Sequence, residues 1–241
     1  VFETRKKLIG QSKFYQATSL YNVNKKGRVL DIGSGIGEVI DVFRENGWRS
    51  HAIEMNPVAT KWLNGRGYDE VFLGSLDDYI TNNKYDIIMA WGVIEHITNP
   101  SLFLKKVYSM LNESGVFVSE VPHSQSLLVD YCKRSNKDPL RILQGEQHNI
   151  LYSKSAYCDI HKKSGLKLHH IQTNGLDMTG REVIVLGAGG TGKSILFSLK
   201  QLGAITIILL NRTLQKAKAL QDDIIIPYSL DNAESLIKND S

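Results

Sequence analysis

Short apolar runs alternate with longer amphipathic stretches along most of the chain. Between the runs, Asn56-Pro57 and Asn99-Pro100 are typical helix starts, because proline is accepted in the first turn. Strands that alternate with helices predict a parallel sheet with crossover helices. In the first part of the chain the predicted strands are residues 28–32, 51–54, 71–73, 86–90, 116–120 and 166–171, and further helices are expected over residues 2–21 and 153–163.

The same pattern restarts after a turn at residues 177–180. Each part has a strand that runs into a glycine-rich loop and then a helix, which favours two nucleotide-type sheets over one. We expect an α/β fold. Residues 1–173 should form a Rossmann-like parallel sheet with helices on both faces, and residues 174–241 a partial second Rossmann βαβ unit. In the second part, strands are predicted at 182–186, 204–210 and 223–226, with one helix that ends at Gly203 and another that follows residues 211–213 and ends near Asp222.

Composition excludes several classes of protein. Because 42% of the 241 residues are hydrophobic, the chain can bury a core and is not generally disordered. Its longest apolar runs, 183–186 and 207–210, fall far short of the about 18 residues of a membrane helix. The two cysteines fit a reducing compartment, so we expect a cytoplasmic protein. The net charge of +4 comes from scattered basic residues, which argues against a nucleic-acid partner.

The first glycine-rich loop, residues 33–37, follows the first predicted strand. Glycines allow a backbone to approach a ligand closely, and in open parallel sheets the ligand lies beyond the carboxyl ends of the strands. Glu54 ends the next strand, where a carboxylate can accept hydrogen bonds from both hydroxyls of a ribose. No third glycine at dinucleotide spacing follows, so the sequence predicts a nucleoside ligand without a pyrophosphate.

These motifs resemble those of class I S-adenosylmethionine-dependent methyltransferases. Residues 29–37 (VLDIGSGIG) resemble the first motif and residues 52–57 (AIEMNP) the second. Residues 85–97 are similar to the fourth-strand motif of the small-molecule branch, residues 115–122 to its fifth strand, and residues 147–153 to a later segment. The resemblance covers about residues 20–172.

The resemblance implies the methyltransferase fold, S-adenosylmethionine as methyl donor and a small-molecule acceptor. The family's usual adenine-binding acid falls at Ser75, so that contact would pass to the Leu76 backbone or to Asp77. The implied donor-binding residues are Asp31, Gly33, Ser34, Gly35, Gly37, Glu54, Met55, Ser75, Leu76 and Trp91.

A sulfonium makes its methyl group electrophilic, so the protein mainly has to align a nucleophile and exclude water. An oxygen acceptor also needs a base, and imidazole titrates near neutrality. His96 is the first candidate for that base, ahead of His123 and His148, although Glu95-His96 could instead position the following helix. The pair His169-His170 lies on a predicted strand with one side chain on each face, and we expect no metal site. Aromatic residues that could line an acceptor pocket, or belong to the core, are Tyr15, Trp91, Tyr131 and Tyr152.

The second glycine-rich loop, residues 187–194, fits both a dinucleotide fingerprint and a P-loop in which Lys193 and Ser194 would reach phosphate and magnesium. The next strand ends in Asn211-Arg212-Thr213 rather than in a metal-directed aspartate, which favours the dinucleotide. An arginine at this place is suited to the 2′-phosphate of NADP. The predicted NADP contacts are Gly187, Gly189, Gly190, Asn211, Arg212 and Thr213.

Residues 175–221 also resemble the NADP-binding domain of shikimate dehydrogenases, through the segments 177–180, 183–190, 202–204 and 211–213. That family carries its catalytic lysine and aspartate in a preceding domain, where this chain has the methyltransferase-like part. We therefore expect no dehydrogenase activity. Both sheets look incomplete and the chain starts at Val1. Either the second sheet extends the first edge to edge, or the chain is a fragment or a natural or artificial fusion. Two alternatives to a methyltransferase stay open: an NADP-binding oxidoreductase remnant and a binding protein without turnover.

Overall fold

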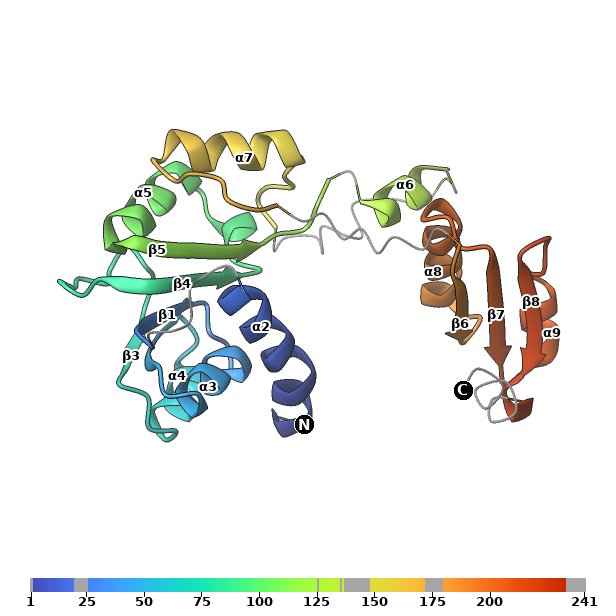
Figure 1. Cartoon of the computed structure of the whole chain (residues 1–241), viewed down its shortest axis with the longest axis horizontal. Coiled ribbons are helices and arrows are strands. Elements are labelled where there is room, and N and C mark those ends of the chain that lie inside the picture. The colour runs from blue at the N-terminus through green and yellow to red at the C-terminus, as the bar shows by residue number, and fades with distance from the viewer. Residues whose placement is uncertain are drawn as a thin grey trace. The chain divides into compact units, whose positions relative to one another are not determined.

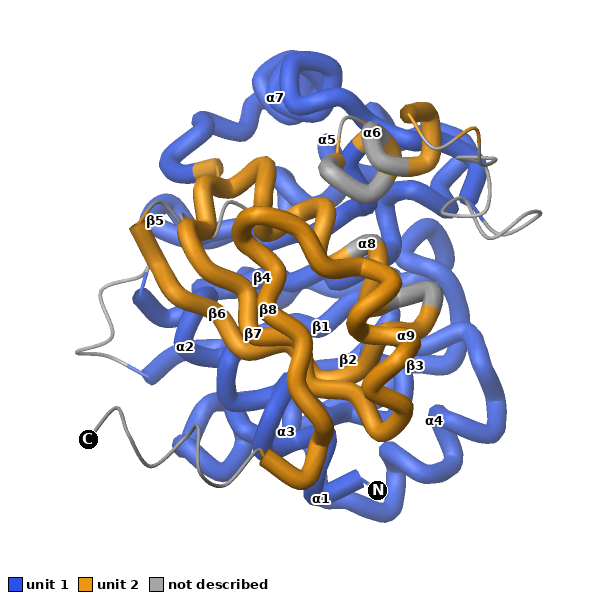
Figure 2. Tube along the Cα trace, turned by 90° about the vertical axis from the view of Figure 1, so that its right-hand side faces the viewer, with its two compact units in different colours: residues 1–123, 146–170 blue, residues 124–145, 171–241 orange. Residues whose placement is uncertain are grey.

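The computed structural model describes residues 2–19, 26–124, 126–134, 136, 148–171 and 180–232. The chain forms two compact units (Figures 1 and 2): unit 1 comprises residues 1–123 and 146–170, and unit 2 comprises residues 124–145 and 171–241. The boundary expected between residues 173 and 174 lies outside the described residues. Among the described residues, no helix has the length and apolar character needed to cross a membrane.

Unit 1 is built on a parallel sheet with the strand order β3-β2-β1-β4-β5. The structure confirms the first five predicted strands, and pairing of Tyr85 with Leu111 extends the last of them toward its start. The parallel directions bring all carboxyl ends to one edge. The strands are β1 (Arg28–Ile32), β2 (Arg49–Glu54), β3 (Glu70–Leu73), β4 (Tyr85–Trp91) and β5 (Leu111–Glu120).

The helices of unit 1 begin where the sequence predicts them. Asn56 caps α4, because its side-chain oxygen accepts the backbone N–H groups of Val58 and Ala59. The helix predicted over 2–21 is interrupted by a π-helical turn, η1, whose Gly10 packs so closely on the Glu38 carbonyl that a side chain there would collide with it. The elements are α1 (Phe2–Arg5), η1 (Lys6–Gly10), α2 (Gln11–Ser19), α3 (Glu38–Glu45), α4 (Pro57–Asn64), η2 (Ile94–His96), α5 (Pro100–Met110) and α7 (Lys154–Lys163).

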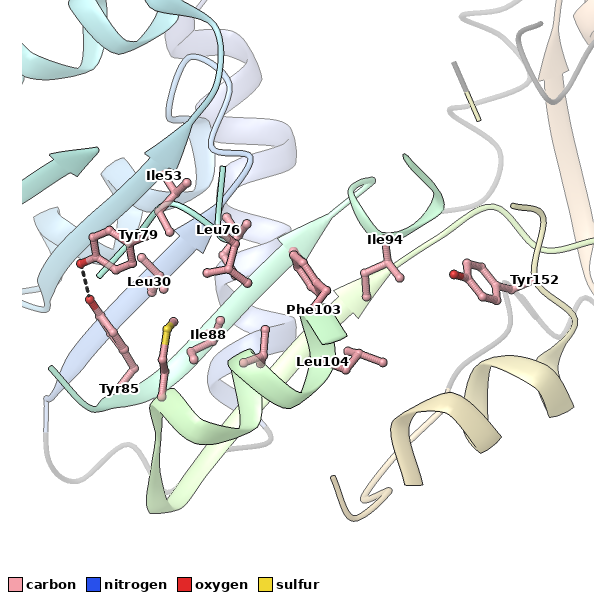
Figure 3. Close-up of a cluster of buried hydrophobic side chains, with 14 residues drawn as sticks. Leu30, Ile53, Leu76, Tyr79, Tyr85, Ile88, Ile94, Phe103, Leu104 and Tyr152 are labelled. Carbon is pink, nitrogen blue, oxygen red and sulfur yellow. Dashed lines mark hydrogen bonds between the residues drawn. The ribbon is translucent and has the colours of Figure 1, made fainter. Parts of the chain in front are cut away.

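The sheet of unit 1 buries both faces. Side chains alternate along a strand, so Leu30 and Ile88 join a cluster with Phe103 of α5 (Figure 3), while Val29 joins Phe43 of α3 on the opposite face. Helices therefore cover both sides, as expected for a parallel sheet.

The sixth strand predicted at residues 166–171 is wrong, because these residues form no strand. A strand needs a partner for its backbone N–H and C=O groups, and the sheet of the described residues ends at β5. Leu166 instead packs its side chain against the core cluster. His169 and His170 are both exposed rather than on opposite faces of a strand.

Unit 2 contains a smaller parallel sheet with the order β6-β7-β8. Its core joins Val185, Leu196, Ile207 and Ala217 from successive elements of the βαβ pattern. Helix α6, which the sequence analysis missed, contributes Arg134 above the ring of Phe197 in α8. The elements are α6 (Leu127–Arg134), β6 (Glu182–Leu186), α8 (Gly190–Gln201), β7 (Thr206–Asn211), α9 (Leu214–Lys218), β8 (Ile225–Ser229) and η5 (Leu230–Asn232).

Candidate functional site

The first candidate site lies beyond the carboxyl ends of the strands in unit 1. The registers Ile32–Ile53, Ile32–Ala90 and Glu54–Leu73 place the ends of β1, β2, β3 and β4 side by side. The ends of these strands and the loops that follow them carry the predicted donor-binding residues, so the fold brings them to one edge.

The glycine loop after β1 adopts backbone conformations that favour glycine. Gly35 has φ +57° and Gly37 has φ +89°. A side chain at Gly37 would press on Leu63 and Tyr68, whereas one at Gly35 would meet no described atom within 4 Å. Gly37 therefore serves packing against α4, and Gly35 is where the backbone is open to a ligand.

Glu54 at the end of β2 holds two loops. Its Oε2 accepts the backbone N–H of Gly35 at 2.7 Å, and its Oε1 accepts that of Asn56 at 2.7 Å. Each carboxylate oxygen has about two lone-pair sites, so both keep capacity for another donor. The carboxylate is thus fixed beside the open glycine and can still accept hydroxyl groups.

Asp31, the second-last residue of β1, is buried with 2% of its surface exposed. Its Oδ1 has no hydrogen-bond partner among the described residues. Burial raises the pKa of this carboxyl to about 8, Lys13 opposes the rise, and Glu38 and Glu54 add to it. Ser34 donates its hydroxyl to the Asp31 backbone carbonyl at 2.8 Å rather than to the carboxyl group. The end of β1 therefore contains a buried acceptor that a cationic ligand group would satisfy.

The remaining predicted donor-binding residues differ in how exposed they are and in what they contact. Met55 is 70% exposed, and Ser75 donates its hydroxyl to Asp78 at 2.6 Å. The Leu76 side chain belongs to the core, so only its backbone is left for a ligand. Trp91 ends β4 with Lys13 Nζ 4.4 Å from the centre of its ring.

The histidines after β4 gather in a way that the sequence analysis did not foresee. His96 in η2 lies beside His148, with 4.8 Å between the ring centres, and Glu95 completes the cluster. His123 forms an isolated backbone bridge with Tyr152. The motif at residues 147–153 drew attention to His148, but the position of this segment beside His96 depends on the fold.

The aromatic acceptor candidates also separate. Tyr15 is 73% exposed, whereas Tyr152 is part of the core. The Tyr131 side chain lies outside the described part of the structure. Trp91 is half-buried at the carboxyl edge of the sheet and stays a candidate.

The second candidate site is in unit 2, at the loop between β6 and α8. A side chain at Gly192 would collide with the Gly187 carbonyl, so the glycine spacing lets the helix approach the strand end. Asn211 links the loop to the end of β7: its Oδ1 accepts the Ala188 N–H at 3.0 Å, and its Nδ2 donates to the Thr213 carbonyl at 2.8 Å. The open pocket here is lined by Ala188, Gly189, Lys193, Asn211, Arg212, Thr213, Lys216, Ala219 and Leu220.

Comparison with protein families identifies the family to which the larger part of the chain belongs. The family model described as a methyltransferase domain matches residues 5–171. The chain belongs to this methyltransferase family. The sequence-based resemblance is thereby confirmed, and unit 1 contains most of the methyltransferase domain.

Solved methyltransferases share the fold. The putative methyltransferase in a complex with the Haloferax volcanii Trm112 activator aligns with TM-score 0.57 and 15% identity, over 83% of this chain and 89% of the other. A putative methyltransferase from Bacillus halodurans aligns with TM-score 0.54 and 18% identity, over 66% and 71%. A plantazolicin methyltransferase crystallised with S-adenosylhomocysteine and a triazolic desmethylPZN analogue gives TM-score 0.52 at 15% identity, over 66% and 64%. At these identities the likeness establishes the fold.

A model described as shikimate / quinate 5-dehydrogenase matches residues 168–240. The shikimate dehydrogenase (NADP(+)) of Caldanaerobacter subterraneus subsp. tengcongensis is 52% identical over 48 residues, 20% of this chain and 17% of that protein. The Bartonella henselae enzyme is 29% identical over 104 residues, 42% of this chain and 34% of that protein. These matches confirm a shikimate dehydrogenase-like segment after the methyltransferase domain, and the chain spans about a third or less of these two relatives.

Proposed function

We propose that the methyltransferase domain transfers a methyl group from S-adenosylmethionine to a small-molecule acceptor. The observation that carries the proposal is the carboxylate of Glu54, fixed on the N–H of Gly35 where the loop is open. This arrangement is suited to a ribose, whose hydroxyls would donate to the free lone pairs of Glu54. A methyltransferase crystallised with S-adenosylhomocysteine has the same fold and supports the choice of donor.

The other predicted contacts would each bind a different part of the donor. The unpartnered Asp31 oxygen would accept a hydrogen bond from the donor's ammonium group, which relieves the cost of its burial. Met55 and the backbone at Ser75 and Leu76 would flank the adenine. Trp91 would border the methyl group at the end of β4.

Transfer itself asks little covalent chemistry of the protein. The acceptor's lone pair forms a bond to the methyl carbon while the carbon–sulfur bond breaks and its electrons return to sulfur. The protein contributes alignment and the exclusion of water. If the acceptor is a hydroxyl, its proton must also leave, and His96 beyond β4 stays the predicted residue on that side.

Calorimetry of the full chain with S-adenosylhomocysteine tests the donor. We expect saturable binding of one ligand per chain, and no detectable binding would overturn the proposal. Transfer of label from methyl-labelled S-adenosylmethionine to a pool of small hydroxyl, amine and thiol compounds then tests turnover. Donor binding without transfer to any member of the pool would favour a binding protein instead.

The pocket in unit 2 supports a second candidate function, binding of NADP. Arg212, Lys193 and Lys216 surround the pocket next to the glycine loop, and the three cations suit the phosphates of the adenosine half. Some relatives of this segment are named as NADP(+)-dependent. The function proposed for unit 2 is binding of the dinucleotide, without dehydrogenase turnover.

A further inference from the structure

Glu95, His96 and His148 bring three metal-ligating side chains to one place in unit 1. One ligand atom from each lies within 4.8 Å of the others. Glu95 and His96 are neighbours in η2, whereas His148 comes from a segment far along the chain. Neither the glycine loop nor Glu54 belongs to this cluster.

Backbone hydrogen bonds fix the distant histidine. The N–H groups of Asn149 and Ile150 both donate to the Glu95 carbonyl, at 2.8 and 3.1 Å. The Asn149 side chain adds a bond from Nδ2 to the His96 carbonyl at 2.6 Å. These hydrogen bonds hold the segment after His148 against η2. The proximity of His148 to Glu95 and His96 therefore does not depend on freely moving surface side chains.

Two of the three side chains bury polar atoms that no described residue satisfies. Glu95 is 2% exposed, and its Oε2 has no hydrogen-bond partner in the described part of the chain. His148 Nδ1 is likewise buried and unpaired among these residues. An unsatisfied buried polar group costs about 1–3 kcal/mol, and more for a charged one, so these atoms indicate a missing partner.

We propose that Glu95, His96 and His148 form a binding site for a divalent first-row transition-metal ion. Two imidazoles and one carboxylate are the protein ligands of several catalytic zinc sites and of non-haem iron sites. Such a set leaves coordination positions open for a further ligand. A single cation would satisfy both the Glu95 oxygen and the His148 nitrogen.

The location of the site suggests that the ion activates the methyl acceptor, and this role rests on the proposed methyl transfer. The proposed metal site and the donor-binding loops lie at the same carboxyl edge of the sheet, because η2 comes directly after β4. A metal ion lowers the pKa of an oxygen bound to it. An acceptor hydroxyl held there would lose its proton to solvent before attack, and His96 would then act as a ligand instead of as a base.

Metal binding by the untagged full chain tests the site directly. After treatment with a chelator and dialysis, we titrate with Co²⁺ and follow its visible absorption, and we repeat the titration with Zn²⁺ in a calorimeter. We expect one ion per chain. The variants Glu95→Gln, His96→Ala and His148→Ala should each weaken binding at least about tenfold, since loss of a supporting residue outside the ligand set already costs that much.

The exposed pair His169 and His170 provides the matched control. The double variant His169→Ala/His170→Ala should bind the metal as the unmodified chain does. The site is refuted by an absence of stoichiometric binding, by unchanged affinity in Glu95→Gln or by loss of binding in the control variant. His96→Ala removes an exposed side chain and serves as the ligand variant least prone to misfolding.

Calorimetry with S-adenosylhomocysteine separates this inference from the proposed function. If the metal binds and S-adenosylhomocysteine does not, the metal site stands and its role in methyl transfer falls. If the donor binds and the metal does not, the proposed function stands and the metal site falls.

Discussion

Glu54 Oε2 accepts the backbone N–H of Gly35 at 2.7 Å, and this bond joins the two loops that would share the methyl donor. The bond crosses from the end of β2 to the glycine loop after β1. It fixes the orientation of the carboxylate before any ligand arrives, so less ordering is left for binding to impose.

Glu54→Ala should abolish detectable binding of S-adenosylhomocysteine. The change removes two charge-assisted hydrogen bonds to a ribose, each worth about 1.5–3 kcal/mol, and releases the glycine loop. Calorimetry measures the loss, and Glu113→Ala on an exposed part of β5 is the control. Unchanged affinity in Glu54→Ala would contradict the assignment.

Asp31→Asn should flatten the dependence of stability on pH. Burial raises the pKa of Asp31 to about 8, against 3.8 for an ordinary aspartate, with Lys13 opposing and Glu38 and Glu54 adding to the rise. Between these values the folded state holds a proton that the unfolded state has released. The free energy of unfolding therefore falls as pH rises, by up to about 1.4 kcal/mol per pH unit from this group.

Urea denaturation at several values between pH 5 and pH 8 checks this prediction. Asp31→Asn cannot ionise, so its stability should decline less steeply than that of the unmodified chain. The exposed Asp77→Asn is the control and should keep the original slope. Equal slopes for the chain and Asp31→Asn would show that Asp31 is already ionised.

Asp41→Asn should destabilise unit 1 strongly. The Asp41 carboxylate is fully buried and binds Lys6, Arg44 and Arg66 at 3.2, 2.9 and 2.7 Å. Removing one member of a buried charged network costs about 3–5 kcal/mol, because the others lose their partner. The exposed Glu45→Gln, which contacts Lys6 from the same helix, should cost under about 1 kcal/mol.

The same carboxylate predicts sensitivity to acid. Burial would raise the pKa of Asp41, but the hydrogen bonds from Arg66, Arg44 and Lys6 outweigh it and lower the pKa to about 2. Its contribution is thus complete above about pH 4 and is lost as pH falls toward 2. Acid unfolding followed by circular dichroism should show this loss in the chain and less of it in Asp41→Asn.

Tyr85→Phe should cost about 1–3 kcal/mol without changing the affinity for S-adenosylhomocysteine. The buried Tyr85 hydroxyl bonds to the Tyr79 hydroxyl at 2.8 Å (Figure 3) and to His51 Nδ1 at 3.1 Å. Tyr85 begins β4, at the edge of the sheet opposite the donor loops, so the loss should appear in denaturation alone. Tyr108→Phe, on an exposed helix face, should change neither quantity.

Arg212→Ala should remove any preference of the chain for NADPH over NADH. The guanidinium at the pocket of unit 2 is the predicted partner of the 2′-phosphate that distinguishes the two. Titration by nucleotide fluorescence measures both affinities. Arg181→Ala, an exposed arginine of the same unit, should leave the preference intact, and a preference that survives Arg212→Ala would move the contact elsewhere.

Local patterns in the sequence already determined β1, the glycine loop after it and the caps at Asn56 and Asn99. Strand periodicity and capping act over a few residues, so neighbours in the chain carry the whole signal. The same holds for Glu54, which the local strand pattern places at the end of the second strand and which ends β2 in the structure. The fold class was therefore within reach of the sequence, and the predicted donor contacts rest on the same local patterns.

The tertiary structure decided which distant side chains meet. Asp41 reads as an ordinary helix residue, yet packing surrounds it with cations from three places in the chain. His148 lies beside His96, next to a segment in which the N–H groups of Asn149 and Ile150 donate to the Glu95 carbonyl. Residues 166–171 carry a strand-like pattern, but without a backbone partner they form no strand. Long-range contacts depend on the packed chain as a whole, whereas periodicity records only what each segment prefers by itself.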